Sequence, residues 1–203
     1  NSLFLDGCGG NLLVKEQELY VGNAGTVARF LTALLALQKG GVYHLDGCEA
    51  MRRRPMNELI DALSGLGCRF EFQDTPGCFP FTMYSNGIEG DNWEVDATKS
   101  SQVLSALLMI SPLINPAMNL YYRGGTVSEP FVHITLEMMK SFSSNQKFKY
   151  LKGEQKIHLE SEGYAVDDFA YEIEPDATAA SYFLTLPLAT GGECLVEGIS
   201  QEM

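Results

Sequence analysis

Residues 19–37 read LYVGNAGTVARFLTALLAL, a short apolar run followed by a glycine-bracketed turn and an apolar segment. The apolar side chains of that segment recur at the spacing of a helix with one buried face: Val27, Phe30, Leu31, Leu34 and Leu35. A cation, Arg29, falls in the first helical turn. The stretch predicts a strand, a tight turn and a helix, and we expect Gly40 and Gly41 to end that helix.

The pattern returns along the chain. The segment RFLTALLAL at 29–37 resembles QVLSALLMI at 102–110, and DATKSS at 96–101 resembles DATAAS at 176–181. Each copy predicts a strand, a helix, a strand, a second helix and a closing pair of strands. We therefore expect an α/β (α+β) fold of repeated β-α-β-α-β-β units, with two complete copies and a third that begins near Ala170. A series of βαβ units in one open parallel sheet is the alternative.

The elements of each copy can be placed more closely. First strands are expected at residues 19–21, 93–95 and 171–173, and CRFEFQ is expected to pair with FPFTMYS. In the second copy KFKYL is expected to pair with QKIHLE across Gly153.

Three prolines bear on the helices. Pro55 and Pro130 fit the first position of the second helix in each copy, where a missing N–H group costs nothing. Pro187 lies inside the helix of the third copy and should kink or shorten it. The acidic segment at 160–170 is the expected boundary, which gives a substrate-binding domain at 1–165 and the start of a second domain at 166–203.

Composition limits the function. The 203 residues carry a formal net charge of -12, which disfavours nucleic acid as a partner. There is no apolar run long enough to span a membrane and no secretory signal, so we expect a cytoplasmic protein. The five cysteines form no C-x-x-C pair and the three histidines are scattered, so we expect no metal and no cofactor. Both ends of the sequence read as cut rather than finished.

Two turns predict anion binding. In GNAGT, Gly22 and Gly25 let the backbone approach a ligand and expose amide groups at a helix start, while Arg29 adds a charge. In DATKSSQ, hydroxyl and amide side chains lie at another helix start beside a cation: Lys99, Ser100, Ser101 and Gln102. A tight packing turn and an ordinary serine cap are the respective alternatives, and the cap explains only one serine.

The loop EAMRRRPM places Arg52, Arg53 and Arg54 before a helix, in a chain with only 14 lysines and arginines. Guanidinium groups bind phosphate and carboxylate with two hydrogen bonds, so a clamp for such groups is one interpretation and a solvated basic loop is the other. Together the turns predict helix starts that converge on one face and bind a ligand with more than one anionic group.

The motifs GNAGTVARFLTALLAL, MRRRPM, SSQVLSALLM, VSEPF and EPDATAASYFL, in this order, resemble the 5-enolpyruvylshikimate-3-phosphate synthase family over nearly the whole chain. The resemblance implies two domains of three β-α-β-α-β-β units each, of the inside-out barrel type, with the active site between them. It implies transfer of the enolpyruvyl group of phosphoenolpyruvate to the 5-hydroxyl of shikimate 3-phosphate, with release of phosphate. It also implies a monomer when the protein is complete, and competition by glyphosate.

The resemblance assigns binding residues by motif. The phosphoenolpyruvate set is Asn23, Ala24, Gly25, Thr26, Arg29, Arg54 and Gln102. The shikimate 3-phosphate set is Ser100, Ser101, Gln102 and Ser128. Asp176 matches an acidic position at the start of the second domain, and the main acid and base groups are expected outside this chain.

The sequence also departs from the family. Phe131 stands where many members have a tyrosine, and Ala50 stands where some members have an arginine. Lys99 occupies a position that is usually small or apolar in the family. The family's N-terminal Lys-Ser…Arg segment and its C-terminal half are missing, so we expect an inactive fragment. The alternatives are the related transferase that acts on UDP-N-acetylglucosamine and a non-catalytic anion-binding module.

Overall fold

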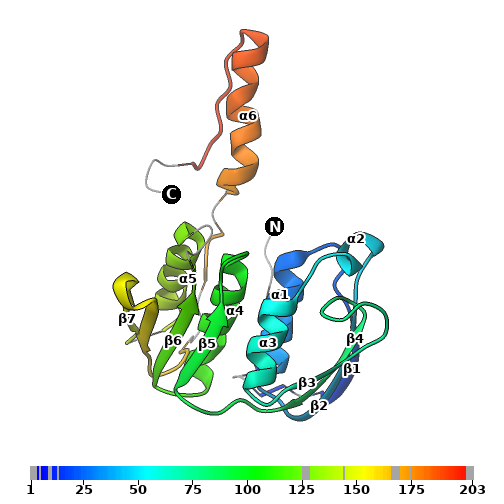
Figure 1. The fold of residues 1–203 in the computed structure, drawn as a ribbon. Helices are drawn as coiled ribbons and strands as arrows, with labels where there is room; N and C mark the ends of the chain where they lie inside the picture. The colour runs from blue at the N-terminus through cyan, green and yellow to red at the C-terminus, as the bar shows by residue number, and fades with distance from the viewer. Residues whose placement is uncertain are drawn as a thin grey trace. The chain divides into compact units, whose positions relative to one another are not determined.

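The computed structural model describes residues 4, 6–8, 11–12, 14–124, 129–143, 145–165, 170–173 and 175–199. The chain divides into two compact units, Asn1–Ala165 and Val166–Met203. Each unit is described here by itself. The first unit contains two successive β-α-β-α-β-β repeats, whose sheets lie outside and whose helices lie between them (Figure 1).

The first repeat has the expected order of elements. It consists of β1 (Glu16–Tyr20), α1 (Gly25–Leu35), β2 (Lys39–Asp46), the short α2 (Glu49–Arg52), α3 (Asn57–Gly65), β3 (Arg69–Phe72) and β4 (Phe81–Asn86). The second repeat follows the same order, with two short 3-10 turns: β5 (Asn92–Asp96), α4 (Ser101–Ile110), η1 (Ser111–Leu113), β6 (Ala117–Arg123), α5 (Glu129–Ser141), β7 (Lys147–Leu151), η2 (Lys152–Glu154) and β8 (Lys156–Glu160).

The two sheets have the same topology, β1-β2-β4-β3 and β5-β6-β8-β7. In each sheet the first two strands are parallel and the other pairs are antiparallel. The repeated β-α-β-α-β-β fold is therefore confirmed, and the open parallel sheet is excluded. Both expected closing pairs form, but Gln155, with φ 49°, adopts the left-handed conformation in the β7–β8 turn, rather than Gly153.

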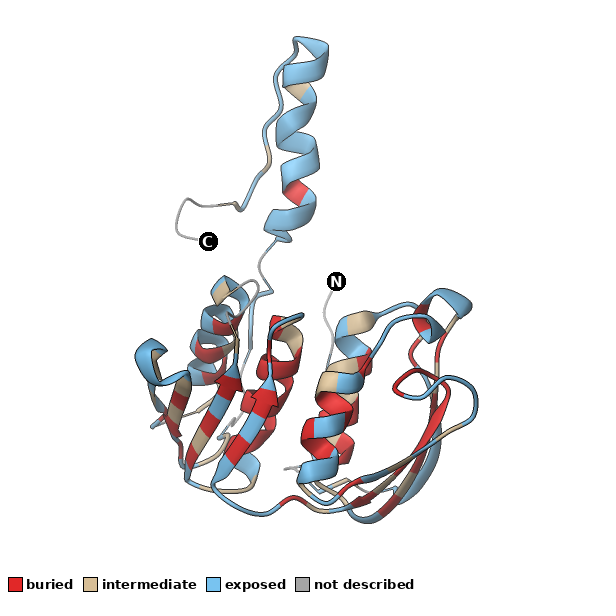
Figure 2. Cartoon of the chain, in the orientation of Figure 1, coloured by how far each residue is buried: buried red, intermediate tan, exposed pale blue. Residues whose placement is uncertain are grey.

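Helix α4 lies at the centre of the first unit. Its length is almost entirely buried, as Figure 2 shows, because α1 packs on one side of it and α5 on another. The sequence anticipates this burial, since SQVLSALLMI is apolar around most of the helix and a helix of that kind must be covered on more than one side. The core between the sheets therefore fixes α1 and α4 against each other.

The end of α1 differs from the prediction. The helix ends at Leu35, and Gly40 and Gly41 belong to β2. Gly40 has φ 69° and lies where the β2–β4 register shifts, so it serves a bulge rather than a helix cap. A Cβ atom on Gly41 would lie 2.5 Å from Cε2 of Tyr43 and 2.6 Å from Oγ of Ser85, which explains the second glycine.

The expected position of Pro55 is also wrong. Helix α3 begins at Asn57, and the N–H group of Met56 donates to the carbonyl oxygen of Gly77 at 2.8 Å, so the chain is still leaving the loop at that point. Pro130 is the second residue of α5, one place after the first position that was predicted for it.

The second unit contains α6 (Ala177–Thr190), capped at its start by Asp176, whose Oδ1 accepts from the N–H of Ala179 at 3.0 Å. The helix does not end at Pro187: it continues to Thr190 and is capped by Gly191, which has φ 72°. The strand expected at 171–173 does not form: these described residues have no regular secondary structure and belong to neither sheet. Within the described residues, every helix is too short or too polar to span a membrane.

We expect Gly41→Ala to lower the free energy of unfolding by about 1–3 kcal/mol, because the added methyl group overpacks the contact with Tyr43 and Ser85. Urea denaturation is the measurement. Gly65→Ala is the matched control, since a Cβ there meets nothing within 4 Å and the change favours the helix by about 0.5–1 kcal/mol. Equal effects of the two substitutions would contradict the packing assigned to Gly41.

Candidate anion-binding site at two helix starts

The turn before α1 is held by β2 and α2. The N–H of Val21 donates to the carbonyl oxygen of Asp46 at 2.9 Å, and the N–H of Cys48 donates to the carbonyl oxygen of Gly22 at 2.9 Å. Gly22 has φ 58°, which a residue with a side chain adopts only with strain. The sequence therefore needs glycine here to turn the chain from the strand into the helix.

The start of α1 lacks a side-chain cap. Its N-cap residue is Ala24, which has no side chain able to accept a hydrogen bond, and the neighbouring Asn23 is exposed and does not cap the helix. The first amide groups of an α-helix have no partner inside the helix. Together with the helix dipole, these amides form a positive end that an anion can satisfy.

Arg29 fastens this helix start to the loop before α3. Its Nη1 donates to the carbonyl oxygen of Gly25 at 3.1 Å, and its Nη2 donates to that of Pro55 at 3.2 Å. Its Nε is buried and has no hydrogen-bond partner among the described residues. Burial lowers the pKa of Arg29, nearby Arg54 adds to this effect, and the carboxylate of Glu58 opposes it.

The three consecutive arginines have different roles. Arg52 donates from Nε and Nη2 to the carboxylate of Asp46, at 2.8 Å and 2.5 Å, and Arg53 pairs with Glu49. Arg54 makes no ion pair with any residue that the structure describes. The interpretation as a solvated, structural loop therefore suits Arg52 and Arg53, whereas the guanidinium of Arg54 is available.

Gly25 brings two guanidinium groups to the start of α1. A Cβ atom at Gly25 would lie 3.2 Å from Nη1 of Arg54 and 3.3 Å from Nη1 of Arg29. Two cations at this distance from one backbone position repel each other, so an anion placed beside Gly25 is attracted by both.

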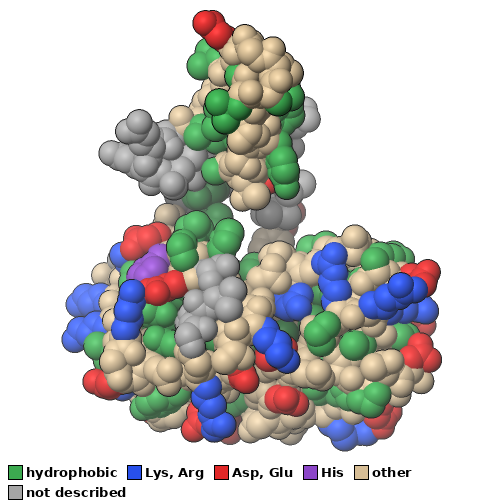
Figure 3. Space-filling model, turned by 45° about the horizontal axis from the view of Figure 1, so that its top comes forward, with side chains coloured by type: hydrophobic (Ala, Val, Ile, Leu, Met, Phe, Trp, Pro, Cys, Tyr) green, Lys and Arg blue, Asp and Glu red, His purple; other side chains and the backbone are tan. Residues whose placement is uncertain are grey.

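The start of α4 adjoins the start of α1. Ser100 is its N-cap and accepts at Oγ from the N–H of Gln102 at 3.2 Å. The side chain of Gln102 then donates from Nε2 to Oγ1 of Thr26 at 3.2 Å, which links the two repeats. Ser101 is buried. Figure 3 shows Lys and Arg side chains gathered over this end of the first unit.

The turn from β5 to α4 contains an interaction that the sequence did not predict. Nζ of Lys99 lies 2.9 Å from Oε1 of Glu58, which belongs to α3 of the other repeat, and the nearby carboxylate raises the pKa of Lys99. The side chain of Glu58 is only 9% exposed. A single carboxylate in an amphipathic helix carries no motif, and only the spacing of opposite charges in the folded chain reveals the pair.

Two other predicted site residues are not among the described residues of the first unit. Ser128 lies outside the described residues, and Asp176 caps α6 in the second unit. Phe131 is 55% exposed on α5, and Ala50 is exposed in α2. The described residues contain no group of three or more His, Cys, Asp or Glu side chains that could hold a metal ion.

We expect Arg52→Met to raise the pKa of Asp46, because the hydrogen bond from Arg52 is the largest cause of its lowering in the folded chain. The stabilisation from this carboxylate is present above its unfolded pKa of about 3.9 and is lost as pH falls through the lower folded value. A ¹³C NMR titration of the Asp46 carboxyl group is the measurement. Arg53→Met is the control and should leave this pKa unchanged; an Asp46 pKa that stays low in Arg52→Met would contradict the assignment.

Sequence comparisons give one consistent result. The family described as EPSP synthase (3-phosphoshikimate 1-carboxyvinyltransferase) matches residues 2–203. The 3-phosphoshikimate 1-carboxyvinyltransferase of Opitutus terrae is 42% identical over 90% of this chain and 41% of its own length. The enzyme of the same name from Trichormus variabilis is 36% identical over 98% of this chain and 45% of its own length. The chain thus spans less than half the length of these relatives.

A larger relative and two solved structures extend the comparison. The pentafunctional AROM polypeptide of Schizosaccharomyces pombe is 37% identical over 98% of this chain and 13% of its own length. Two structures of EPSP synthase from Acinetobacter baumannii superpose with TM-scores of 0.57 and 0.56 over 73% of this chain, at 24% and 25% identity. They cover 31% and 32% of those chains and support the fold.

Proposed function

The chain belongs to the EPSP synthase family, and from this premise we propose that it supplies substrate-binding residues of a 3-phosphoshikimate 1-carboxyvinyltransferase. The reaction transfers the enolpyruvyl group of phosphoenolpyruvate to the 5-hydroxyl of shikimate 3-phosphate and releases phosphate. One observation carries the proposal: an uncapped, arginine-flanked helix start is joined to a second helix start by the Gln102–Thr26 hydrogen bond. Two adjacent positive ends suit two polyanionic substrates.

Phosphoenolpyruvate is proposed to bind at the start of α1. The amide groups after Ala24 and the guanidinium groups of Arg29 and Arg54 offer hydrogen bonds and positive charge to its phosphate and carboxylate. The amide side chains of Asn23 and Gln102 are proposed to contact phosphoenolpyruvate at the same helix start, where Gln102 donates to Thr26. An anionic competitor of phosphoenolpyruvate, such as glyphosate, is proposed to bind the same groups.

Shikimate 3-phosphate is proposed to bind beside it, at the start of α4. Ser100 is the N-cap of that helix, and Ser101 and Gln102 are its first two residues. The hydroxyl of Ser101 is buried in the free chain, so its proposed contact requires that the ligand reach the base of the turn. Ser128, the residue before Glu129 in the sequence, is proposed to complete this set.

The proposed chemistry is addition followed by elimination. The 5-hydroxyl oxygen bonds to C2 of phosphoenolpyruvate while a base removes its proton and an acid protonates the methylene carbon. In the second step the bond from C2 to the phosphate oxygen breaks, the methyl group formed in the first step loses a proton to restore the carbon–carbon double bond, and phosphate leaves. Arg29 and Arg54 stabilise the charge on phosphate and carboxylate throughout. The acid and base are proposed to lie in sequence that the longer relatives have and these 203 residues lack.

The cellular context is proposed to follow from this activity. The complete protein is proposed to be a cytoplasmic monomer that acts on small-molecule substrates. It is proposed to have no nucleic-acid or membrane partner, as suits a biosynthetic transferase. The net charge of -12 supports the exclusion of nucleic acid.

Isothermal titration calorimetry of the purified chain with shikimate 3-phosphate tests the proposal. We expect weak binding without turnover, and activity once the remaining sequence of a close relative is supplied as a second polypeptide. Binding that is never accompanied by restored activity would favour an anion-binding module. No binding by a folded sample would contradict both.

We expect Arg54→Ala to weaken phosphoenolpyruvate binding by roughly tenfold to a hundredfold, because a charged hydrogen bond is worth about 1.5–3 kcal/mol. The apparent dissociation constant in the complemented enzyme is the measurement. Arg53→Ala is the matched control, since Arg53 is committed to Glu49 and should matter little. An unchanged constant for Arg54→Ala would remove that residue from the site.

A further inference from the structure

The pair formed by Lys99 and Glu58 joins the two repeats directly beside the proposed site. Lys99 immediately precedes Ser100 in the β5–α4 turn, and Glu58 lies in the first turn of α3. Nζ and Oε1 are 2.9 Å apart, with Glu58 almost fully buried and Lys99 largely exposed. Removal of Lys99 would leave the mostly buried carboxylate of Glu58 without its partner charge, which costs more than breaking a pair between two exposed side chains.

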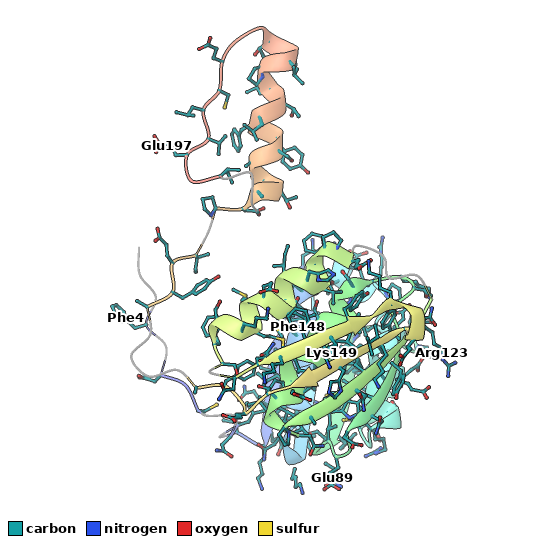
Figure 4. All side chains as sticks on the ribbon, turned by 90° about the vertical axis from the view of Figure 1, so that its left-hand side faces the viewer. Phe4, Glu89, Arg123, Phe148, Lys149 and Glu197 are labelled. Carbon is teal, nitrogen blue, oxygen red and sulfur yellow. The ribbon has the colours of Figure 1, made fainter. Side chains whose placement is uncertain are left out.

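The remaining residues of this turn are already fixed within their own repeat. Oδ1 of Asp96 accepts from the N–H of Thr98 at 2.9 Å and from its Oγ1 at 2.5 Å, and Ser100 caps α4. The N–H of Ala97 donates to the carbonyl oxygen of Arg123 at 3.4 Å, and Figure 4 shows Arg123 at the end of β6. Lys99 is therefore, besides Gln102, a side chain by which this end of the second repeat contacts the first.

Glu58 also faces the cations of the first repeat. Its negative charge opposes the lowering of the Arg29 pKa that burial and Arg54 produce. The carboxylate thus pairs with Lys99 of the second repeat and acts electrostatically on Arg29 of the first. Beside it, a cavity of about 380 Å³ lies between α3 and β5, with Lys99 and Glu58 in its wall.

We propose that Glu58 and Lys99 are positioning residues, an ion pair between a mostly buried carboxylate and an exposed ammonium group that holds the Ser100–Ser101 turn of the second repeat at a fixed place relative to the Arg29–Arg54 cations of the first. The role assigned to the pair rests on the proposed function, because the turn and the arginines are the two halves of that site. The pair prepares both halves before any substrate arrives, which removes an ordering cost from binding.

A simpler role for Lys99 predicts the opposite change in anion affinity for one variant. If Lys99 acted only as a positive charge that attracts substrate, Glu58→Gln would free that charge and tighten anion binding. If the pair positions the turn, Glu58→Gln weakens binding, although it makes the site more positive. The sign of this single change therefore separates the two roles.

The test measures the dissociation constant for shikimate 3-phosphate by calorimetry on the full chain. We expect Glu58→Gln and Lys99→Met each to weaken binding by about tenfold, and the double variant to lose little more, as residues that act together do. Lys99→Arg, which keeps the charge, should bind like the unmodified chain. Lys39→Met is the control, since Lys39 pairs at 3.4 Å with Glu89 on the surface, where both side chains are largely exposed. Tighter or unchanged binding in Glu58→Gln would overturn the proposal.

Amide hydrogen exchange without ligand separates this proposal from the proposed function. We expect the amides of residues 97–102 to exchange faster in Glu58→Gln, while the buried amides of Leu104 and Leu107 in α4 keep their protection. Unchanged exchange at 97–102 overturns the positioning role even if the unmodified chain binds shikimate 3-phosphate. Failure of the unmodified chain to bind overturns the proposed function, and with it the purpose assigned to the pair.

Discussion

The packing of α4 against α1 is the constraint on which the rest of the first unit depends. Each repeat alone exposes an apolar helix face, and burying the two faces against each other places both helix starts at one end of the core. Because the helices pack in this way, the side chain of Gln102 lies within hydrogen-bond distance of the Thr26 hydroxyl. The polar chemistry of the two turns is thus arranged by apolar contacts several residues away from it.

Electrostatics at this end is organised around one buried carboxylate. Arg29 and Arg54 lie close to Gly25, and Lys99 approaches from the other repeat. Their mutual repulsion is reduced by Glu58, while Arg52 and Arg53 are neutralised by other carboxylates. An acidic chain can in this way contain a small positively charged site, because a few cations lie close together while most of the acidic residues lie elsewhere on its surface.

Much of this organisation could be predicted from the sequence. The repeat of apolar helix patterns gave the order of elements, and the closing strand pairs followed from alternating residues. The misplaced details have physical causes: Gly40 serves a bulge instead of ending α1, and Pro55 lies outside α3. Residues 171–173, expected as a strand, belong to neither sheet. The Glu58–Lys99 pair could not be predicted, since it depends on a distance between two repeats that no local pattern encodes.

The most direct test of the central claim is an NMR titration of the ¹⁵N-labelled chain with shikimate 3-phosphate and inorganic phosphate. If the starts of α1 and α4 form one site, the amides of Gly25 and Thr26 and those of Ser101 and Gln102 will shift together and saturate with a common dissociation constant. Shifts confined to one helix start, or two sets that saturate independently, would contradict a site shared by the two repeats.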